Sequence, residues 1–179
     1  LNHYFTEMYD QIIGNDGILD KYIGDAIMAV FGTPFIGPED ADNALQAGID
    51  MIEALKRFNT VRQNQGMEMI DIGIGINTGE VVSGNIGSDK RMDFTVIGDG
   101  VNLAARLESA TKSYQTPILI SMGTKEALTK SFGLREVDFL QVKGKLEPVS
   151  IFEVIDALPE DERPSILSSL ERHNHALSL

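Results

Sequence analysis

Asp25 is the first residue of this sequence whose surroundings point to chemistry. It follows Gly24 and precedes an apolar run, residues 26–31, which Gly32 ends. A run of this length between glycines predicts a strand that is buried on both faces. A carboxylate at the mouth of such a strand must be solvated, hydrogen-bonded or bound to a cation, because an unpaired buried charge is costly. An ordinary turn explains the same two residues, since Gly and Asp are both frequent in turns.

A lysine and a helical pair could act together with this carboxylate. Lys21 lies four residues before Asp25, on the other side of the Gly24 turn. Asn102 and Arg106 share one face of a predicted helix, since residues four apart on a helix are neighbours. Taken alone, Arg106 is better explained as a solvated helix residue.

Two further positions have weaker signals. Lys143 and Lys145 flank Gly144, which places two ammonium groups in a flexible turn suited to a polyphosphate. Lysine-rich turns are also common on surfaces, so this motif alone decides nothing. Thr95 lies at the end of an apolar strand, where threonine needs no special explanation.

The elements that must position these residues alternate between helices and strands. Helical periodicity predicts helices over residues 2–14, 41–65, 101–112 and 123–130. Strands are expected over residues 17–23, 26–31, 70–77, 80–87, 93–97, 117–121, 139–142 and 149–155. Residues 77–79 are expected to form a hairpin turn. Because tight turns join several strand pairs, the pattern favours an α+β sandwich, with a mostly antiparallel sheet covered by helices on one face.

Composition narrows the class of protein. The 179 residues suit one domain with a proper core, and the formal net charge of -12 offers no basic stripe for nucleic acid. Anionic membranes are disfavoured for the same reason, and no apolar run is long enough to span a bilayer. The sequence has no cysteine, which fits a reducing compartment, so we expect a cytoplasmic location. Gly73 and Gly75 are not a dinucleotide fingerprint, because a strand rather than a helix is expected to follow them.

Four ordered motifs together resemble the catalytic domain of class III nucleotidyl cyclases, the adenylyl and guanylyl cyclases. They are residues 21–32, 75–79, 94–108 and 142–145, and the resemblance runs from Leu1 to about Ile155. It implies a ferredoxin-like βαβ–βαβ fold with extra strands, paired head to tail in a homodimer with the substrate at the interface. The catalytic domain would cover residues 1–156, and residues 157–179 would be a linker or tail with a short helix.

The resemblance also implies a role for each polar residue. Asp25 matches the second of two aspartates that hold two divalent ions, Mg²⁺ or Mn²⁺. Asn102 matches the residue that orients the ribose, and Arg106 the one that stabilises charge on the α-phosphate. Lys143 matches the lysine on the β- and γ-phosphates, with Lys145 as a close competitor.

Lys21 and Thr95 match the pair that reads the purine. In the family, a lysine with a threonine at these positions goes with adenine, whereas a glutamate in place of the lysine goes with guanine. The expected activity is therefore that of an adenylyl cyclase, which converts ATP to cyclic AMP and pyrophosphate. The alternatives are a guanylyl cyclase and a degenerate domain that binds nucleotide or a partner without turnover.

One departure from the family concerns the first metal aspartate. In the family it lies on a strand about forty residues before the second, and the sequence begins at the helix that follows that strand. We therefore expect a fold that lacks its first strand and half of its metal site. An upstream sensor or regulatory domain is also expected.

Overall fold

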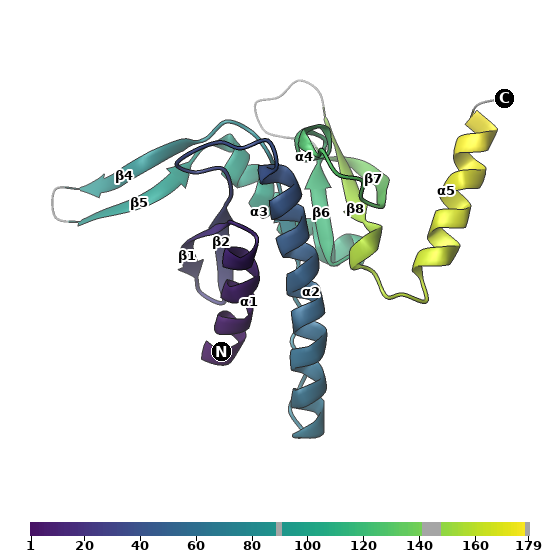
Figure 1. Ribbon diagram of the computed structural model, residues 1–179, viewed down its shortest axis with the longest axis horizontal. Coiled ribbons are helices and arrows are strands. Elements are labelled where there is room, and N and C mark those ends of the chain that lie inside the picture. Colours follow the sequence, from purple (N-terminus) through teal and green to yellow (C-terminus); the bar gives the residue numbers. More distant parts are fainter. Residues whose placement is uncertain (89–90, 141–147, 178–179) are drawn as a thin grey trace.

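The structure is a computed structural model, and it describes residues 1–88, 91–140 and 148–177. Its elements are, in order along the chain, α1 (Asn2–Gly14), β1 (Ile18–Ile23), β2 (Ala26–Val30), α2 (Asp40–Asn64), β3 (Ile74–Ile76), β4 (Val82–Ser88), β5 (Arg91–Ile97), α3 (Asp99–Tyr114), β6 (Ile118–Ser121), α4 (Met122–Ala127), β7 (Leu134–Leu140), β8 (Val149–Val154), the 3₁₀ helix η1 (Ile155–Ala157) and α5 (Arg163–Leu177). Helices α1 and α2 lie side by side, and the β4–β5 hairpin and α5 project at opposite sides of the molecule (Figure 1).

A four-stranded sheet in the order β3-β6-β8-β7 forms the centre of the molecule. β3 pairs with β6 in parallel, and the other two pairings in this sheet are antiparallel. The hairpins β1–β2 and β4–β5 form two further antiparallel sheets. The predicted α+β class with mostly antiparallel pairing is therefore confirmed.

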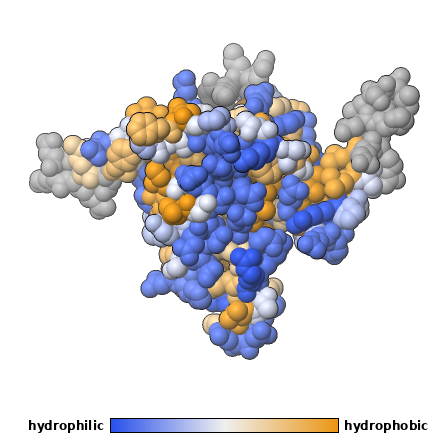
Figure 2. Space-filling model, in the orientation of Figure 1, coloured by the Kyte–Doolittle hydropathy of each residue, from blue (hydrophilic) through white to orange (hydrophobic). Residues whose placement is uncertain are grey.

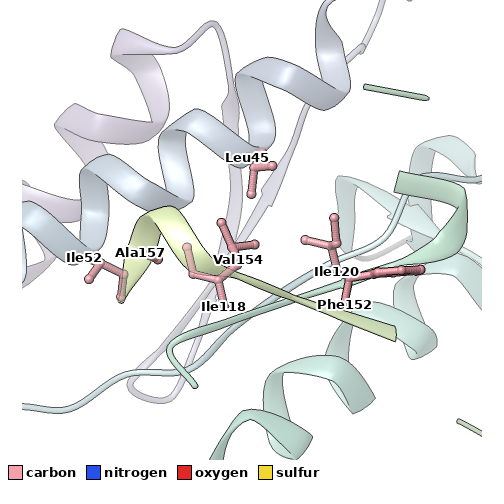
Figure 3. Close-up of a cluster of buried hydrophobic side chains, with 7 residues drawn as sticks. All are labelled: Leu45, Ile52, Ile118, Ile120, Phe152, Val154 and Ala157. Carbon is pink, nitrogen blue, oxygen red and sulfur yellow. The ribbon is translucent and has the colours of Figure 1, made fainter. Parts of the chain in front are cut away.

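The hydrophobic core lies on both faces of the central sheet. Ile118 and Ile120 of β6 pack in one cluster with Leu45 and Ile52 of α2, as Figure 3 shows. Leu119, which alternation turns to the opposite face, packs instead with leucines of α3. The expectation that helices cover only one face was wrong, because residues 118–120 of β6 are apolar on both faces of the sheet and are completely buried.

Helix α3 lies directly against β3, without intervening side chains. A Cβ atom added at Gly75 would overlap the backbone oxygen of Ala104 and the backbone nitrogen of Glu108. One at Gly73 would overlap the Thr111 hydroxyl in the same helix. The small residues that alternate with isoleucine along this strand therefore allow the close approach of α3.

The predicted hairpin turn at residues 77–79 was wrong. Strands β3 and β4 flank these residues, but β3 pairs with β6 whereas β4 pairs with β5. The expectation that a strand rather than a helix follows Gly75 is confirmed by β4. Alternation in a sequence shows which residues share a face of a strand, but not which strand lies beside it.

Two other expectations need correction. The strand after Asp25 is only partly buried, because β2 pairs with β1 alone among the described strands. The C-terminal segment contains α5, a helix of 15 residues, which is longer than the short helix expected there. In the described part of the chain, no helix combines the length and apolarity needed to cross a bilayer.

A buried carboxylate connects α2 to the segment after α4. The Asp42 side chain accepts hydrogen bonds from the backbone amides of Thr129 and Lys130, at 3.1 and 3.0 Å, and from the Thr129 hydroxyl. Burial raises the pKa of Asp42, but these hydrogen bonds and the Lys130 charge outweigh it, so that the pKa lies below its ordinary value.

Candidate active site

The hairpin β1–β2 carries three charged residues of the candidate site. Lys21 lies in β1, and Asp25 lies in the turn beyond Gly24, exposed to solvent. Gly24 has a φ of 65° and open space around it, so the backbone conformation alone favours glycine there. The third charged residue is Asp20, whose importance the sequence did not reveal.

Asp20 is the extra residue of a β-bulge. The register of β1 against β2 passes from Leu19 opposite Ala29 to Lys21 opposite Met28, and Asp20 is left without a partner. A bulge breaks the alternation of side chains between the two faces of a strand. Asp20 and Lys21 can therefore approach each other although they are consecutive in a strand.

Asp20 joins the two residues expected to read the base. Its side chain is only 5% exposed, and its Oδ2 accepts a hydrogen bond of 2.8 Å from the hydroxyl of Thr95 in β5. The same oxygen lies 3.4 Å from Nζ of Lys21, whose side chain is 41% exposed. The structure thus brings Lys21 and Thr95 to one place, through a carboxylate between them.

Asp25 lies at the far end of the same hairpin, near α1. The pKa of Tyr4 is raised, first by burial of the ring and then by the negative charge of Asp25. This places the Asp25 carboxylate within electrostatic reach of the Tyr4 hydroxyl. Among the described residues, Asp25 makes no ion pair, so its oxygens are open to an external partner.

Asn102 and Arg106 lie one turn apart on α3, and both are exposed. Within the described ranges, neither side chain has a hydrogen bond or an ion pair. An amide and a guanidinium on one helix face form a set of donors for oxygen acceptors. No described contact joins Asp25 to either residue.

Asn77 holds the start of α3 in place and is a second residue that the sequence did not single out. Its Nδ2 donates to the carbonyl oxygen of Gly100 at 3.1 Å, and its Oδ1 accepts from the Ser121 hydroxyl at 2.7 Å. It therefore connects the end of β3 to the first turn of α3 and to the end of β6. An asparagine directly after a strand was the available signal, but the expected hairpin turn gave it another explanation.

The described residues fit a metal ion only in part. Asp25 could supply one oxygen ligand, and Mg²⁺ commonly binds through one or two carboxylates together with substrate phosphates. Among the described residues, however, no three histidine, aspartate, glutamate or cysteine side chains gather as a metal site. Lys143 and Lys145 lie outside the described residues.

Comparison with known proteins gives a consistent result. The sequence profile of the family described as "Adenylate and Guanylate cyclase catalytic domain" matches residues 1–154. The chain is 45% identical over 161 residues to the adenylate cyclase of Anabaena cylindrica, covering 86% of this chain and 31% of that protein. It is 40% identical over 182 residues to the terminal-differentiation specific adenylate cyclase of Dictyostelium discoideum, covering 100% of this chain and 8% of that protein.

Solved structures of an adenylyl cyclase and of a guanylyl cyclase resemble this fold to a similar degree. The adenylyl cyclase CyaB from P. aeruginosa superposes with a TM-score of 0.77 at 38% identity, over 86% of this chain and 79% of that one. The guanylyl cyclase Cya2 superposes with a TM-score of 0.74 at 42% identity, over 87% of this chain and 78% of that one. Overall similarity therefore extends to cyclases of both purine nucleotides.

Proposed function

Because this chain belongs to the family of adenylate and guanylate cyclase catalytic domains, we propose that it converts ATP to 3′,5′-cyclic AMP and pyrophosphate. The observation that carries the choice of ATP is the cluster in which Asp20 joins Lys21 to Thr95. Lysine is a donor that suits the N1 acceptor of adenine, and a threonine oxygen can accept from the 6-amino group. Guanine presents the opposite pattern, with a donor at N1 and an acceptor at C6.

The exposed face of α3 supports roles in the reaction. In the proposed reaction the ribose 3′-oxygen attacks the α-phosphorus, and pyrophosphate leaves. Asn102 would orient the ribose, and Arg106 would stabilise the charge that grows on the α-phosphate oxygens. A permanently charged, planar donor group suits that task. Lys143 would bind the β- and γ-phosphates, with Lys145 as the alternative.

We expect Mg²⁺ or Mn²⁺ to be required. A divalent ion bound to the nucleotide would polarise the 3′-hydroxyl and neutralise phosphate charge. Asp25 would contribute one ligand, since its carboxylate is exposed and has no described ion pair. The remaining carboxylate would come from a strand that precedes α1. Among the described strands, β2 and β3 each have a free edge. Ile27 of β2 packs in one core cluster with Ile70 and Ile72, which lie just before β3, and this arrangement agrees with such a strand.

We further propose a head-to-tail homodimer in which each site takes residues from both protomers. Asp25 would serve one site, whereas Lys21, Thr95, Asn102 and Arg106 of the same protomer would serve the other. Exposed apolar side chains on the β4–β5 hairpin, including Met92 at 61% and Phe94 at 59%, agree with a surface that a second copy covers. Apolar side chains on this projecting hairpin are visible in Figure 2.

The whole protein's activity and regulation extend beyond these residues. The chain spans 8% and 31% of the two curated relatives described above. A sensor or regulatory domain on the same polypeptide, upstream of the cyclase domain, is therefore part of the proposal.

A guanylyl cyclase is the second candidate, and the 42% identity to the guanylyl cyclase Cya2 favours it. Product analysis of the full-length protein with ATP and with GTP, in the presence of Mg²⁺ or Mn²⁺, separates the two. Cyclic AMP as the main product supports the proposal, and cyclic GMP made from GTP as the main product contradicts it. No turnover of either nucleotide would identify a degenerate binding domain.

The shared site is tested by mixing two inactive variants, Asp25→Ala and Arg106→Ala. In a mixed dimer one site collects both defects and the other collects none. Random exchange of equal amounts makes about half of the dimers mixed, so activity should return to about a quarter of wild type. If exchange is confirmed by labelled subunits and no activity returns, the two residues do not serve different sites.

A further inference from the structure

The Thr95 hydroxyl has only one proton, and the structure directs it to Asp20. A threonine hydroxyl has one donor and two acceptor lone pairs, and it rotates to suit its partners. By itself it would accept from an amino group at C6 of a purine or donate to a carbonyl at the same position. Here its Oγ1 lies 2.8 Å from Oδ2 of Asp20, and an ionised carboxylate only accepts.

The surroundings make this direction hard to reverse. Asp20 is 5% exposed and Thr95 is 6% exposed, so water competes little for either group. A hydrogen bond to a charged acceptor is about twice as strong as one between neutral groups, and more so in a dry environment. Rotating the hydroxyl toward a purine carbonyl would therefore break a strong bond and leave a buried carboxylate without the hydrogen bond from Thr95.

Asp20 also acts on Lys21. The Lys21 ammonium lies 3.4 Å from the same Oδ2, and this ion pair attracts the ammonium to that side of the strand. The bulge at Asp20 allows both contacts, because it releases this residue from the regular alternation. One carboxylate thus sets a donor at Lys21 beside an acceptor at Thr95.

We propose that Asp20 is a positioning residue for base selection: by taking the Thr95 proton, it makes Thr95 an acceptor and thereby selects a 6-aminopurine. This inference rests on the proposed function, because it requires that Lys21 and Thr95 face the base. Asp20 itself need not touch the nucleotide. It acts through the direction of a neighbour's hydroxyl group.

The test compares three nucleotides with the full-length protein. They are ATP, the purine ribonucleoside triphosphate that lacks a substituent at C6, and inosine triphosphate. The first two share an acceptor at N1, so the ratio of their kcat/KM values reports the contact to the 6-amino group and not the contact to Lys21. Inosine triphosphate reports tolerance of a carbonyl at C6.

The informative variant is Asp20→Asn, which has nearly the same shape and can donate as well as accept. We expect the kcat/KM ratio of ATP to the unsubstituted nucleotide to fall about tenfold, and the relative use of inosine triphosphate to rise. In a Thr95→Val background the same change at Asp20 should leave the first ratio unaltered, since no hydroxyl remains to be directed. Asp20→Glu, which keeps the carboxylate, should retain more of the preference than Asp20→Asn.

A matched control is Asp138→Asn. Asp138 also lies in a strand and accepts from a hydroxyl, that of Tyr114, but it lies in β7 of the central sheet. This variant should leave all three kcat/KM values in their wild-type proportions. If Asp20→Asn instead lowers all three values equally, Asp20 has only a structural role and the inference is overturned.

Failure of the underlying function gives a different result. If wild type makes no cyclic nucleotide, or if Lys21→Glu and Thr95→Val leave its base preference unchanged, the proposed site is wrong whatever Asp20 does. If Asp20→Asn does not fold, the kcat/KM ratios of the Asp20→Glu and Thr95→Val variants still test the inference. A wild-type preference for ATP that survives in Thr95→Val overturns the inference.

Discussion

Gly75→Ala should displace α3 and thereby damage both stability and activity. The added methyl group would overlap backbone atoms of Ala104 and Glu108, which cannot rotate away as a flexible side chain can. Helix α3 must then withdraw from β3 by about 1 Å to restore ordinary contact distances, which forfeits a quarter to a half of the dispersion attraction across the gap.

The size of the effect follows from what α3 buries. Leu103 and Leu107 on its inner face are almost completely buried, and full burial of each is worth about 1.5–3 kcal/mol. Overpacking a core costs about 1–3 kcal/mol, and the entropy advantage of alanine over glycine returns about 0.5–1 kcal/mol. We expect a net loss of about 2 kcal/mol in the free energy of unfolding, or about 5 °C in Tm for a domain of this size.

The assay is urea denaturation followed by circular dichroism, with Gly84→Ala as the matched control. Gly84 also lies in a strand, β4, but a Cβ atom there would meet nothing within 4 Å. That variant should stay within about 0.5 kcal/mol of wild type or gain slightly.

Activity gives a second measurement. Because α3 carries Asn102 and Arg106, a shift of about 1 Å should lower kcat/KM for ATP about 100-fold in the folded Gly75→Ala variant. If Gly75→Ala is as stable as Gly84→Ala and as active as wild type, the close approach of α3 does not constrain the fold or the site, and the reasoning from this contact is refuted.

Three other outcomes are expected. Asp42→Asn should lower the free energy of unfolding by about 1–3 kcal/mol at neutral pH. Because the pKa of Asp42 is lowered in the folded state, this difference should be fully present above about pH 5 and should shrink as the pH falls through 3.8 and below. Denaturation measured at several pH values tests this. Ser121→Ala removes the side chain that caps α4 by accepting from the Thr124 amide, and should cost about 1 kcal/mol in the same assay. Arg106→Lys keeps the charge but loses the planar pair of donors, so kcat should fall at least about 100-fold in a cyclic AMP assay with little change in Tm; near-normal kcat would exclude a role in charge stabilisation.

Local sequence patterns predicted the helices and strands well, but they predicted poorly which strands pair with each other. The turn at Gly24 and Asp25 and the helix carrying Asn102 and Arg106 follow from residues close together in the sequence. The parallel pairing of β3 with β6 joins strands separated by the whole of α3, and no periodicity encodes that choice. For this reason residues 77–79 were interpreted as a hairpin turn.

The cluster around Asp20 shows a second limit of sequence reasoning. Lys21 and Thr95 were identified from motifs, but the residue between them was not. Its hydrogen bond with Thr95 spans 75 positions and depends on a β-bulge, and an irregular register cannot be deduced from alternation. Two adjacent charged residues within a strand were a usable sign, since a regular strand would turn one of them toward the core.

The free edges of β2 and β3 have a practical consequence for solubility. An unpaired strand edge presents a row of N–H and C=O groups that can pair with any extended chain. The β4–β5 hairpin adds exposed apolar side chains, Val82 and Ile97 among them. A fragment that starts at Leu1, without the proposed strand before α1, would therefore tend to precipitate through edge-to-edge pairing. Where the polypeptide is cut for expression should decide whether the domain remains in solution at all.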